Sequence, residues 1–168
     1  APLKIFGLRT TIEQTKAILA LFSWEKWENL YPVEFIEVSD KNETIFIDNS
    51  NIKVTSTPVK HLIPTIGIKC EFPKSQKKLV YSSDSEPCSS IQQLAKGVHV
   101  LIHEAAGYGV GHSSAQQCGE LANVCEVEEL YLIHYPTGID PGTMIFAAKE
   151  HFNGKVFIAE DFNKILFA

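Results

Sequence analysis

The pattern of apolar and polar positions changes near residue 84. Before it, short apolar runs that alternate with polar positions predict strands at 3–7, 33–38, 44–48, 51–59, 65–72 and 78–83. A polar turn at 48–50 predicts a hairpin. Between the first two strands, apolar residues recur at helical spacing, at Ile12, Ala17, Ile18, Leu21 and Phe22. We expect a helix there, with Thr10 or Thr11 at its N-cap.

Beyond residue 84, strands alternate with helices. The pattern predicts strands at 98–103, 129–134, 155–161 and 164–168, and helices at 89–97, 113–127 and 141–154. A serine opens the second helix, and the third has proline near its start and glycine at its end. This alternation favours a sheet with helices along one side.

Three residues that often bind metals close three separate apolar runs: His61, Asp84 and His134. Strand ends along one edge of an open α/β sheet converge in space, and ligands bind there. Imidazole and carboxylate groups are donors that zinc, manganese and iron accept. The pattern predicts a metal site but leaves two alternatives open. Asp84 can instead cap the helix that follows it, and each histidine can be a hydrogen-bonded structural residue.

A second pair of residues carries acid–base chemistry. Glu104 leaves the end of a strand, and His112 lies in a glycine-bordered loop before a helix. A carboxylate beside an imidazole favours the protonated ring and fixes its tautomer. Such a histidine can donate a proton to a departing alkoxide. The alternative is that His112 serves only as an N-cap or a loop spacer.

Composition narrows the class of protein. A chain of 168 residues with 45% hydrophobic and 21% charged residues is typical of one globular domain, here 1–168. A net charge of −5 argues against a broad basic face for duplex nucleic acid. It does not exclude a nuclease, because active-site metals attract phosphate.

Localisation and redox state follow from what the sequence lacks. It contains no apolar run of 18 residues and no secretory signal pattern at its start. Its four cysteines show no C-x-x-C spacing. We therefore expect a cytoplasmic protein with reduced, mostly buried thiols, in which Cys118 and Cys125 share a helix face and pack in the core.

Several motifs, taken in order, resemble a known family. They are YSSDSEP, LIHEAAG, GHSSAQQCGELA and LYLIHYPTG, with PLKIFG at the start, His61 and Gly67 before the aspartate motif, and FNGKVFIAEDF near the end. Together they resemble the metallo-β-lactamase superfamily in its ribonuclease Z-like branch. The resemblance covers nearly the whole chain.

The resemblance implies both a fold and a reaction. The fold is α+β, a four-layer αββα sandwich. The site holds two divalent metal ions, most often zinc with manganese or iron as alternatives, bridged by a hydroxide. His61 would bind one ion, His134 the other, and Asp84 would bridge them. Glu104 and His112 would match the pair that protonates the leaving group. The implied reaction is phosphodiester hydrolysis, with another ester, a lactone, a thioester or a β-lactam as alternative substrates.

The chain departs from the family in one important way. The metal-binding motif H-x-H-x-D-H does not occur in the sequence. The chain is then a C-terminal portion of a longer protein, or upstream residues are missing from it, or the site has been lost. The missing part would contribute several strands of the first sheet, so we expect the sandwich to be incomplete on its N-terminal side. The sheet edge left exposed favours a homodimer. A non-catalytic binding module on the same fold is the alternative to an active hydrolase.

A second departure concerns the substrate. A short turn, PKSQKK, joins two strands where transfer-RNA-processing members of the branch carry a long arm that grips RNA. Its absence argues against a dedicated transfer-RNA 3′ endonuclease. We therefore expect a small-molecule or single-stranded nucleic-acid phosphodiester as substrate.

Overall fold

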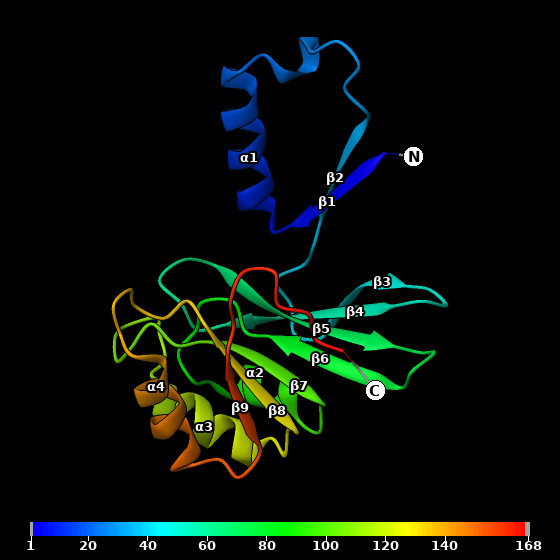
Figure 1. Cartoon of the computed structure of the whole chain (residues 1–168). Coiled ribbons are helices and arrows are strands. Elements are labelled where there is room, and N and C mark those ends of the chain that lie inside the picture. The colour runs from blue at the N-terminus through cyan, green and yellow to red at the C-terminus, as the bar shows by residue number, and fades with distance from the viewer. Residues whose placement is uncertain (1, 167–168) are drawn as a thin grey trace. The chain divides into compact units, whose positions relative to one another are not determined.

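The computed structural model describes residues 2–166, which form two compact units, Ala1–Asp40 and Lys41–Ala168 (Figure 1). Each unit has its own sheet, with two strands in the first and seven in the second. The assignment of the whole chain to one domain stays a prediction. In residues 2–166, no helix combines the length and the apolar character needed to cross a bilayer.

The N-terminal unit contains β1 (Leu3–Gly7), α1 (Arg9–Leu21), a 3-10 turn (Trp24–Lys26) and β2 (Val33–Glu37). β1 and β2 pair in parallel. The predicted helix is confirmed, but the predicted cap at Thr10 or Thr11 is wrong. The N-cap is Leu8, whose buried side chain anchors the helix start without a side-chain cap hydrogen bond.

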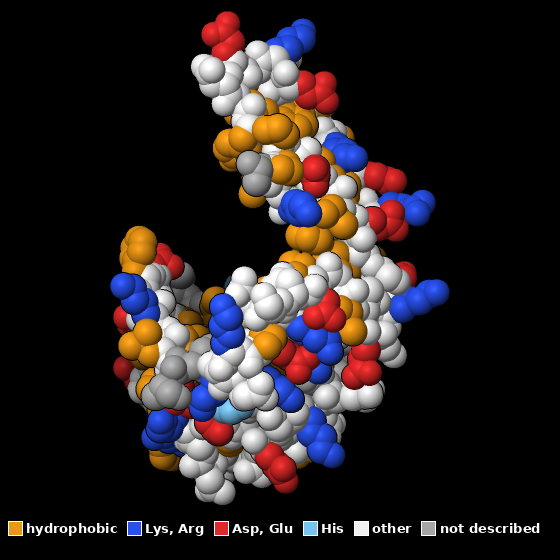
Figure 2. Space-filling model, turned by 90° about the vertical axis from the view of Figure 1, so that its right-hand side faces the viewer, with side chains coloured by type: hydrophobic (Ala, Val, Ile, Leu, Met, Phe, Trp, Pro, Cys, Tyr) orange, Lys and Arg blue, Asp and Glu red, His pale blue; other side chains and the backbone are white. Residues whose placement is uncertain are grey.

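The apolar face predicted for α1 is largely uncovered in the described residues. Ile12 is buried, whereas Ile18, Leu21 and Phe22 are 58%, 83% and 64% exposed. A two-stranded sheet is too narrow to cover a whole helix face. Hydrophobic side chains accordingly gather on the surface of this unit in Figure 2.

The C-terminal unit is built on a seven-stranded sheet whose strands lie in chain order. The strands are β3 (Thr44–Asp48), β4 (Lys53–Val59), β5 (Thr65–Phe72), β6 (Lys77–Tyr81), β7 (Val100–Glu104), β8 (Glu129–Ile133) and β9 (Lys155–Ile158). Neighbouring strands are antiparallel from β3 to β6 and parallel from β6 to β9. The predicted β3–β4 hairpin is confirmed.

Three helices lie along one face of this sheet (Figure 1): α2 (Ser89–Ala95), α3 (Ala115–Val124) and α4 (Pro141–Lys149). This is the arrangement that the alternating pattern predicts. Ser114 caps α3 in a reciprocal capping box with Gln117. Asp140 caps α4 immediately before its first-turn proline.

One hydrophobic cluster fills the space between the helices and the sheet. Cys118 and Cys125 are fully buried in it and free of disulfides, as predicted. The expected last strand at 164–168 is wrong for residues 164–166, which have no strand, and its final residues 167–168 lie outside the described part.

Strand direction places four chain segments at the same edge of the sheet. β4 and β6 are both antiparallel to β5, so they run in the same direction. β7 and β8 are parallel to β6. The carboxyl ends of β4, β6, β7 and β8 therefore share one edge. The segments that contain His61, Asp84, Glu104 and His134 all lie at or just beyond these ends.

Candidate metal centre

The three predicted ligands come together at this edge. Asp84 lies between the two histidines: its Oδ1 is 3.1 Å from His134 Nδ1, and its Oδ2 is 4.0 Å from His61 Nε2. The His61 side chain is nearly buried, whereas those of Asp84 and His134 are partly open to solvent. Residues separated by up to 73 positions in the sequence thus form one polar cluster.

His112 belongs to the same cluster. Asp84, His112 and His134 each offer one ligand atom, and these atoms lie within 4.8 Å of one another. The ring of His112 is 5.0 Å from that of His61 and 5.6 Å from that of His134, between centroids. The sequence predicts a proton donor at His112 and not a metal ligand, but the structure places its ring beside the predicted ligands.

Glu104 forms the base of the cluster. Its side chain is 1% exposed, and its carboxylate lies 3.4 Å from His112 Nδ1 and 4.0 Å from His134 Nδ1. The carboxylate accepts hydrogen bonds from the backbone N–H groups of Ser113 at 2.6 Å, Ala106 at 2.9 Å and Ser85 at 3.3 Å. These donors compensate the burial of the charge. They also fix the carboxylate in place relative to the two imidazoles.

The capping alternatives left open for Asp84 and His112 are wrong in this structure. The N-cap of α2 is Cys88, without a side-chain cap hydrogen bond, so Asp84 does not cap that helix. The N-cap of α3 is Ser114, not His112. Because neither side chain serves as a cap, both remain available for the cluster.

The backbone beside the cluster adopts unusual conformations. Ser83 and His134 have φ angles of 53° and 55°, in the left-handed region that residues other than glycine rarely adopt. Such conformations cost on the order of 1–3 kcal/mol each and persist where the surrounding structure enforces them. Here the Ser83 hydroxyl donates to the Ile66 carbonyl at 2.9 Å. The two left-handed conformations occur immediately before Asp84 and at His134 itself, where they set the direction of the two side chains.

The donor set fits a divalent transition metal. Imidazoles and one carboxylate are the donors that zinc accepts. The buried Nδ1 of His112 makes no hydrogen bond of good geometry, although Glu104 is within ion-pair distance. Ligand atoms around one zinc ion lie about 3–3.5 Å apart, given bonds near 2.0–2.1 Å. The ligand atoms of Asp84, His112 and His134 lie within 4.8 Å of one another, somewhat wider than this spacing.

The sequence interpretation missed two residues that link the segments of this site, Glu86 and Gly111. Glu86 accepts the Gly111 N–H at 2.8 Å and pairs with Lys60. Hydrogen bonds from Lys60 and Gly111 lower the pKa of Glu86. The Gly-bordered loop around His112 was a signal for Gly111, but no residue pattern marks Glu86.

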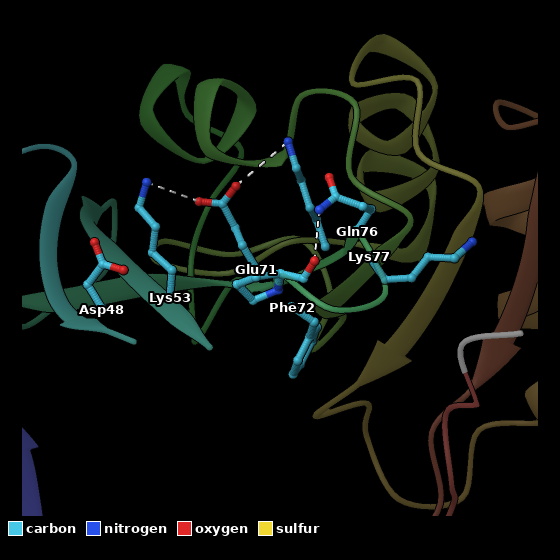
Figure 3. Close-up of a pocket in the computed structure, with 8 residues that line it drawn as sticks. Asp48, Lys53, Glu71, Phe72, Gln76 and Lys77 are labelled. Carbon is cyan, nitrogen blue, oxygen red and sulfur yellow. Dashed lines mark hydrogen bonds and ion pairs between the residues drawn. The ribbon is translucent and has the colours of Figure 1, made fainter. Parts of the chain in front are cut away.

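One pocket of this unit lies away from the cluster. It has a volume of about 180 Å³ and is lined by Asp48, Glu71, Phe72 and the lysines of β4 and β6 (Figure 3). These residues lie where β3 and β5 end and where β4 and β6 begin, whereas Asp84 follows the end of β6. Glu71 pairs with Lys53 and Lys78. No histidine is among the described residues that line this pocket, whereas the rings of His61, His112 and His134 lie together at the other edge.

The surface around that pocket carries mixed charge. Figure 2 shows Lys and Arg side chains interspersed with Asp and Glu on the visible face of this unit, without a broad basic area. A duplex nucleic acid binds to extended positive surfaces.

Comparison with known proteins identifies the family. Residues 8–135 match the model of the beta-lactamase superfamily domain. This chain belongs to the β-lactamase superfamily. The ribonuclease Z of Mycobacterium tuberculosis (strain H37Rv) is 27% identical to this superfamily member over 191 aligned positions, covering 98% of this chain and 69% of the relative. A ribonuclease Z of Mycobacterium sp. (strain KMS) is 28% identical, covering 84% of this chain and 56% of the relative.

Solved structures show the same fold. The metallo-β-lactamase fold protein YhfI from Bacillus subtilis has a TM-score of 0.76 at 22% identity, covering 95% of this chain and 63% of that one. The short form of human tRNase Z has a TM-score of 0.72 at 20% identity, covering 96% of this chain and 66% of that one. The predicted metallo-β-lactamase-type α+β fold is confirmed. This superfamily member spans about two thirds of the length of these structures.

Proposed function

We propose that this superfamily member is a metal-dependent hydrolase that cleaves phosphodiesters of small molecules or of single-stranded nucleic acid. The observation that carries the proposal is the cluster of Asp84, His134 and His61 at one sheet edge, with Glu104 buried beside His112. The similarity to ribonucleases Z supports the same reaction class. The homodimer and the cytoplasmic location remain predictions.

Asp84, His134 and His61 would hold the divalent metal, with zinc as the first candidate. When bound, such an ion polarises a phosphoryl oxygen and lowers the pKa of water. The two-ion site implied by the resemblance needs the motif H-x-H-x-D-H, which this sequence lacks. We therefore propose that the described residues supply only part of a two-ion site.

His112 and Glu104 would handle the proton. We assign His112 as the donor of a proton to the departing oxygen, because its ring adjoins both Asp84 and His134. Glu104 faces His112 Nδ1 at 3.4 Å and would orient the imidazole ring. The three backbone N–H groups keep the Glu104 carboxylate from rotating away. General acid catalysis of this kind contributes about 10²–10⁴-fold in rate.

The missing motif favours a second candidate, a binding module without catalysis. One assay distinguishes the two candidate functions, the hydrolysis of bis(p-nitrophenyl) phosphate in the presence of zinc or manganese. A hydrolase loses activity with chelator and with Asp84→Asn. The matched control is Asp48→Asn, which changes a carboxylate at the remote pocket and should leave turnover unaltered. Turnover that ignores both the chelator and Asp84→Asn would refute the assignment of the site.

A second variant tests the proton donor. His112→Asn should lower the maximal rate by about 10²-fold or more on a dinucleotide, whose leaving group is an alkoxide that needs a proton. The loss should be smaller on bis(p-nitrophenyl) phosphate, because p-nitrophenoxide departs without a proton. An equal loss on both substrates would argue for a ligand role of His112 instead.

A further inference from the structure

One carboxylate outside the cluster connects three of the segments that build it. Glu86 Oε1 accepts the Gly111 N–H at 2.8 Å, and its Oε2 lies 2.5 Å from Lys60 Nζ. The backbone reinforces this arrangement, since the Glu86 N–H donates to the Lys60 carbonyl at 2.8 Å. Lys60 precedes His61, Glu86 follows Asp84 by two residues, and Gly111 precedes His112.

The peptide group of Gly111 passes this contact on to His61. The Gly111 carbonyl lies 2.8 Å from His61 Nδ1. A carbonyl oxygen only accepts hydrogen bonds, so Nδ1 carries the hydrogen and Nε2 keeps its lone pair. His61 Nε2 is the nitrogen that faces Asp84, at 4.0 Å. A bond to the far nitrogen of a ligating histidine is what selects its tautomer in metal sites.

Only glycine fits at position 111. Its φ angle is +84°, which side chains disfavour. A Cβ built there would lie 2.7 Å from His61 Nδ1. The short approach of the loop to His61 therefore depends on the absence of a side chain.

We propose that Glu86 is a positioning residue: through the Gly111 peptide it holds His61 in the Nδ1–H tautomer, with Nε2 turned to the metal site. The inference rests on the proposed metal-binding role of His61. The side-chain contacts of Glu86 are with Lys60 and Gly111, so it acts on His61 through the loop. Its ion pair with Lys60 keeps the carboxylate in place, while its bond to Gly111 transmits the effect.

The first experiment reads the tautomer without any metal. Long-range ¹⁵N–¹H correlation NMR of the metal-free 168-residue chain at about pH 8, above the ordinary pKa of imidazole, distinguishes the two neutral forms. We expect Nδ1–H for His61 in the wild type and a mixture of tautomers in Glu86→Ala. Glu86→Gln keeps an oxygen that can accept the Gly111 N–H, so it should retain the wild-type tautomer. An unaltered His61 spectrum in Glu86→Ala would overturn the proposal.

A matched control separates positioning from general loss of an ion pair. Glu71 is comparably exposed, 24% against 21% for Glu86, and also pairs with lysine. Glu71→Ala should leave the His61 tautomer unchanged. A change as large as that in Glu86→Ala would show that the spectrum reports overall stability, and the proposal would fail. Should Glu86→Ala not fold, Glu86→Asp provides the same readout, because its shorter side chain withdraws the carboxylate from the Gly111 N–H.

The second experiment measures zinc affinity by competition with a chromophoric chelator. Loss of an outer partner of a metal ligand costs about 10–100-fold in affinity. We expect a loss of this size in Glu86→Ala, a smaller one in Lys60→Met and none in Glu71→Ala. Equal affinities in Glu86→Ala and wild type would contradict the proposal. If the wild type bound no zinc, the proposed function would fail, and the NMR result would still decide the role of Glu86.

Discussion

The buried carboxylate of Glu104 gives the sharpest prediction about stability. In Glu104→Gln, the amide keeps one oxygen, which can still accept the N–H groups of Ser113 and Ser85 that now bind Oε1. The NH₂ group then faces the Ala106 N–H, which donates to Oε2 at 2.9 Å in the wild type. One hydrogen bond is lost, and two donors oppose each other at a largely buried position.

The magnitude follows from these contacts. A hydrogen bond to a charged group contributes about 1.5–3 kcal/mol, and an unpaired buried donor costs about 1–3 kcal/mol. We expect Glu104→Gln to lower the free energy of unfolding by about 2–3 kcal/mol. Glu104→Ala removes the acceptor of all three N–H groups and should cost about 4 kcal/mol or more. Both losses occur without metal or substrate.

Urea unfolding followed by far-UV circular dichroism measures the change. Both tryptophans, Trp24 and Trp27, lie in the N-terminal unit, so their fluorescence reports that unit separately. The control is Glu120→Gln on the outside of α3, where a surface change should stay within about 0.5 kcal/mol. A loss below about 1 kcal/mol in Glu104→Gln would refute the view that the three N–H groups depend on this carboxylate.

Three further predictions concern the helix layer and the core. A Cβ at Gly119 would lie 2.3 Å from the Ala148 carbonyl oxygen. Gly119→Ala should therefore destabilise the C-terminal unit by about 1–3 kcal/mol. An unchanged midpoint of urea unfolding would contradict the close approach of α3 and α4. Burial opposes ionisation of Cys88, but hydrogen bonds outweigh it and lower its pKa, whereas burial raises the pKa of Cys125 to about 11. Iodoacetamide should therefore label Cys88 first, and equal labelling rates by mass spectrometry would contradict this order. Burial lowers the pKa of His103, so near neutral pH and below, the unfolded chain binds a proton that the folded chain does not. The free energy of unfolding should therefore fall as pH drops below about 6.5, and His103→Asn should reduce that fall in urea titrations. An identical pH dependence in the variant and the wild type would contradict this prediction.

The sequence predicts the location of the site because strand direction is a simple rule. Each apolar run that ends in His61, Asp84 or His134 becomes a strand whose carboxyl end lies at the same edge. Parallel strands joined by helices leave few other arrangements. For His61, which follows β4, the rule holds because β4 and β6 are both antiparallel to β5 and therefore run in the same direction.

Other features depend on contacts that no local pattern encodes. The contact of Glu86 with Gly111 spans 25 positions, and that of His61 with Gly111 spans 50. Glu86 is one acidic residue among 20, and only the fold distinguishes it. Threonine is a common N-cap, so the sequence predicts a threonine cap for α1, yet the buried Leu8 sets where the helix begins. Tertiary packing overrides local preference at that position.

The placement of His112 was also beyond the sequence. Its glycine-bordered loop suggested a role in catalysis, but not the distance to Asp84 and His134. That distance depends on the turn in which the His112 N–H donates to the Gly109 carbonyl at 3.2 Å. Proton donor and metal ligand are therefore both compatible with its position, and the two leaving groups proposed above separate these roles.

The most direct test of the account is a calorimetric zinc titration of the metal-free chain, beside Asp84→Asn and His134→Ala. We predict that the wild type binds zinc and that each substitution abolishes or strongly weakens the binding, while Asp48→Asn at the remote pocket leaves it intact. A wild type that takes up no zinc, or variants that bind it as tightly as the wild type, would contradict the central claim that these side chains form a metal centre.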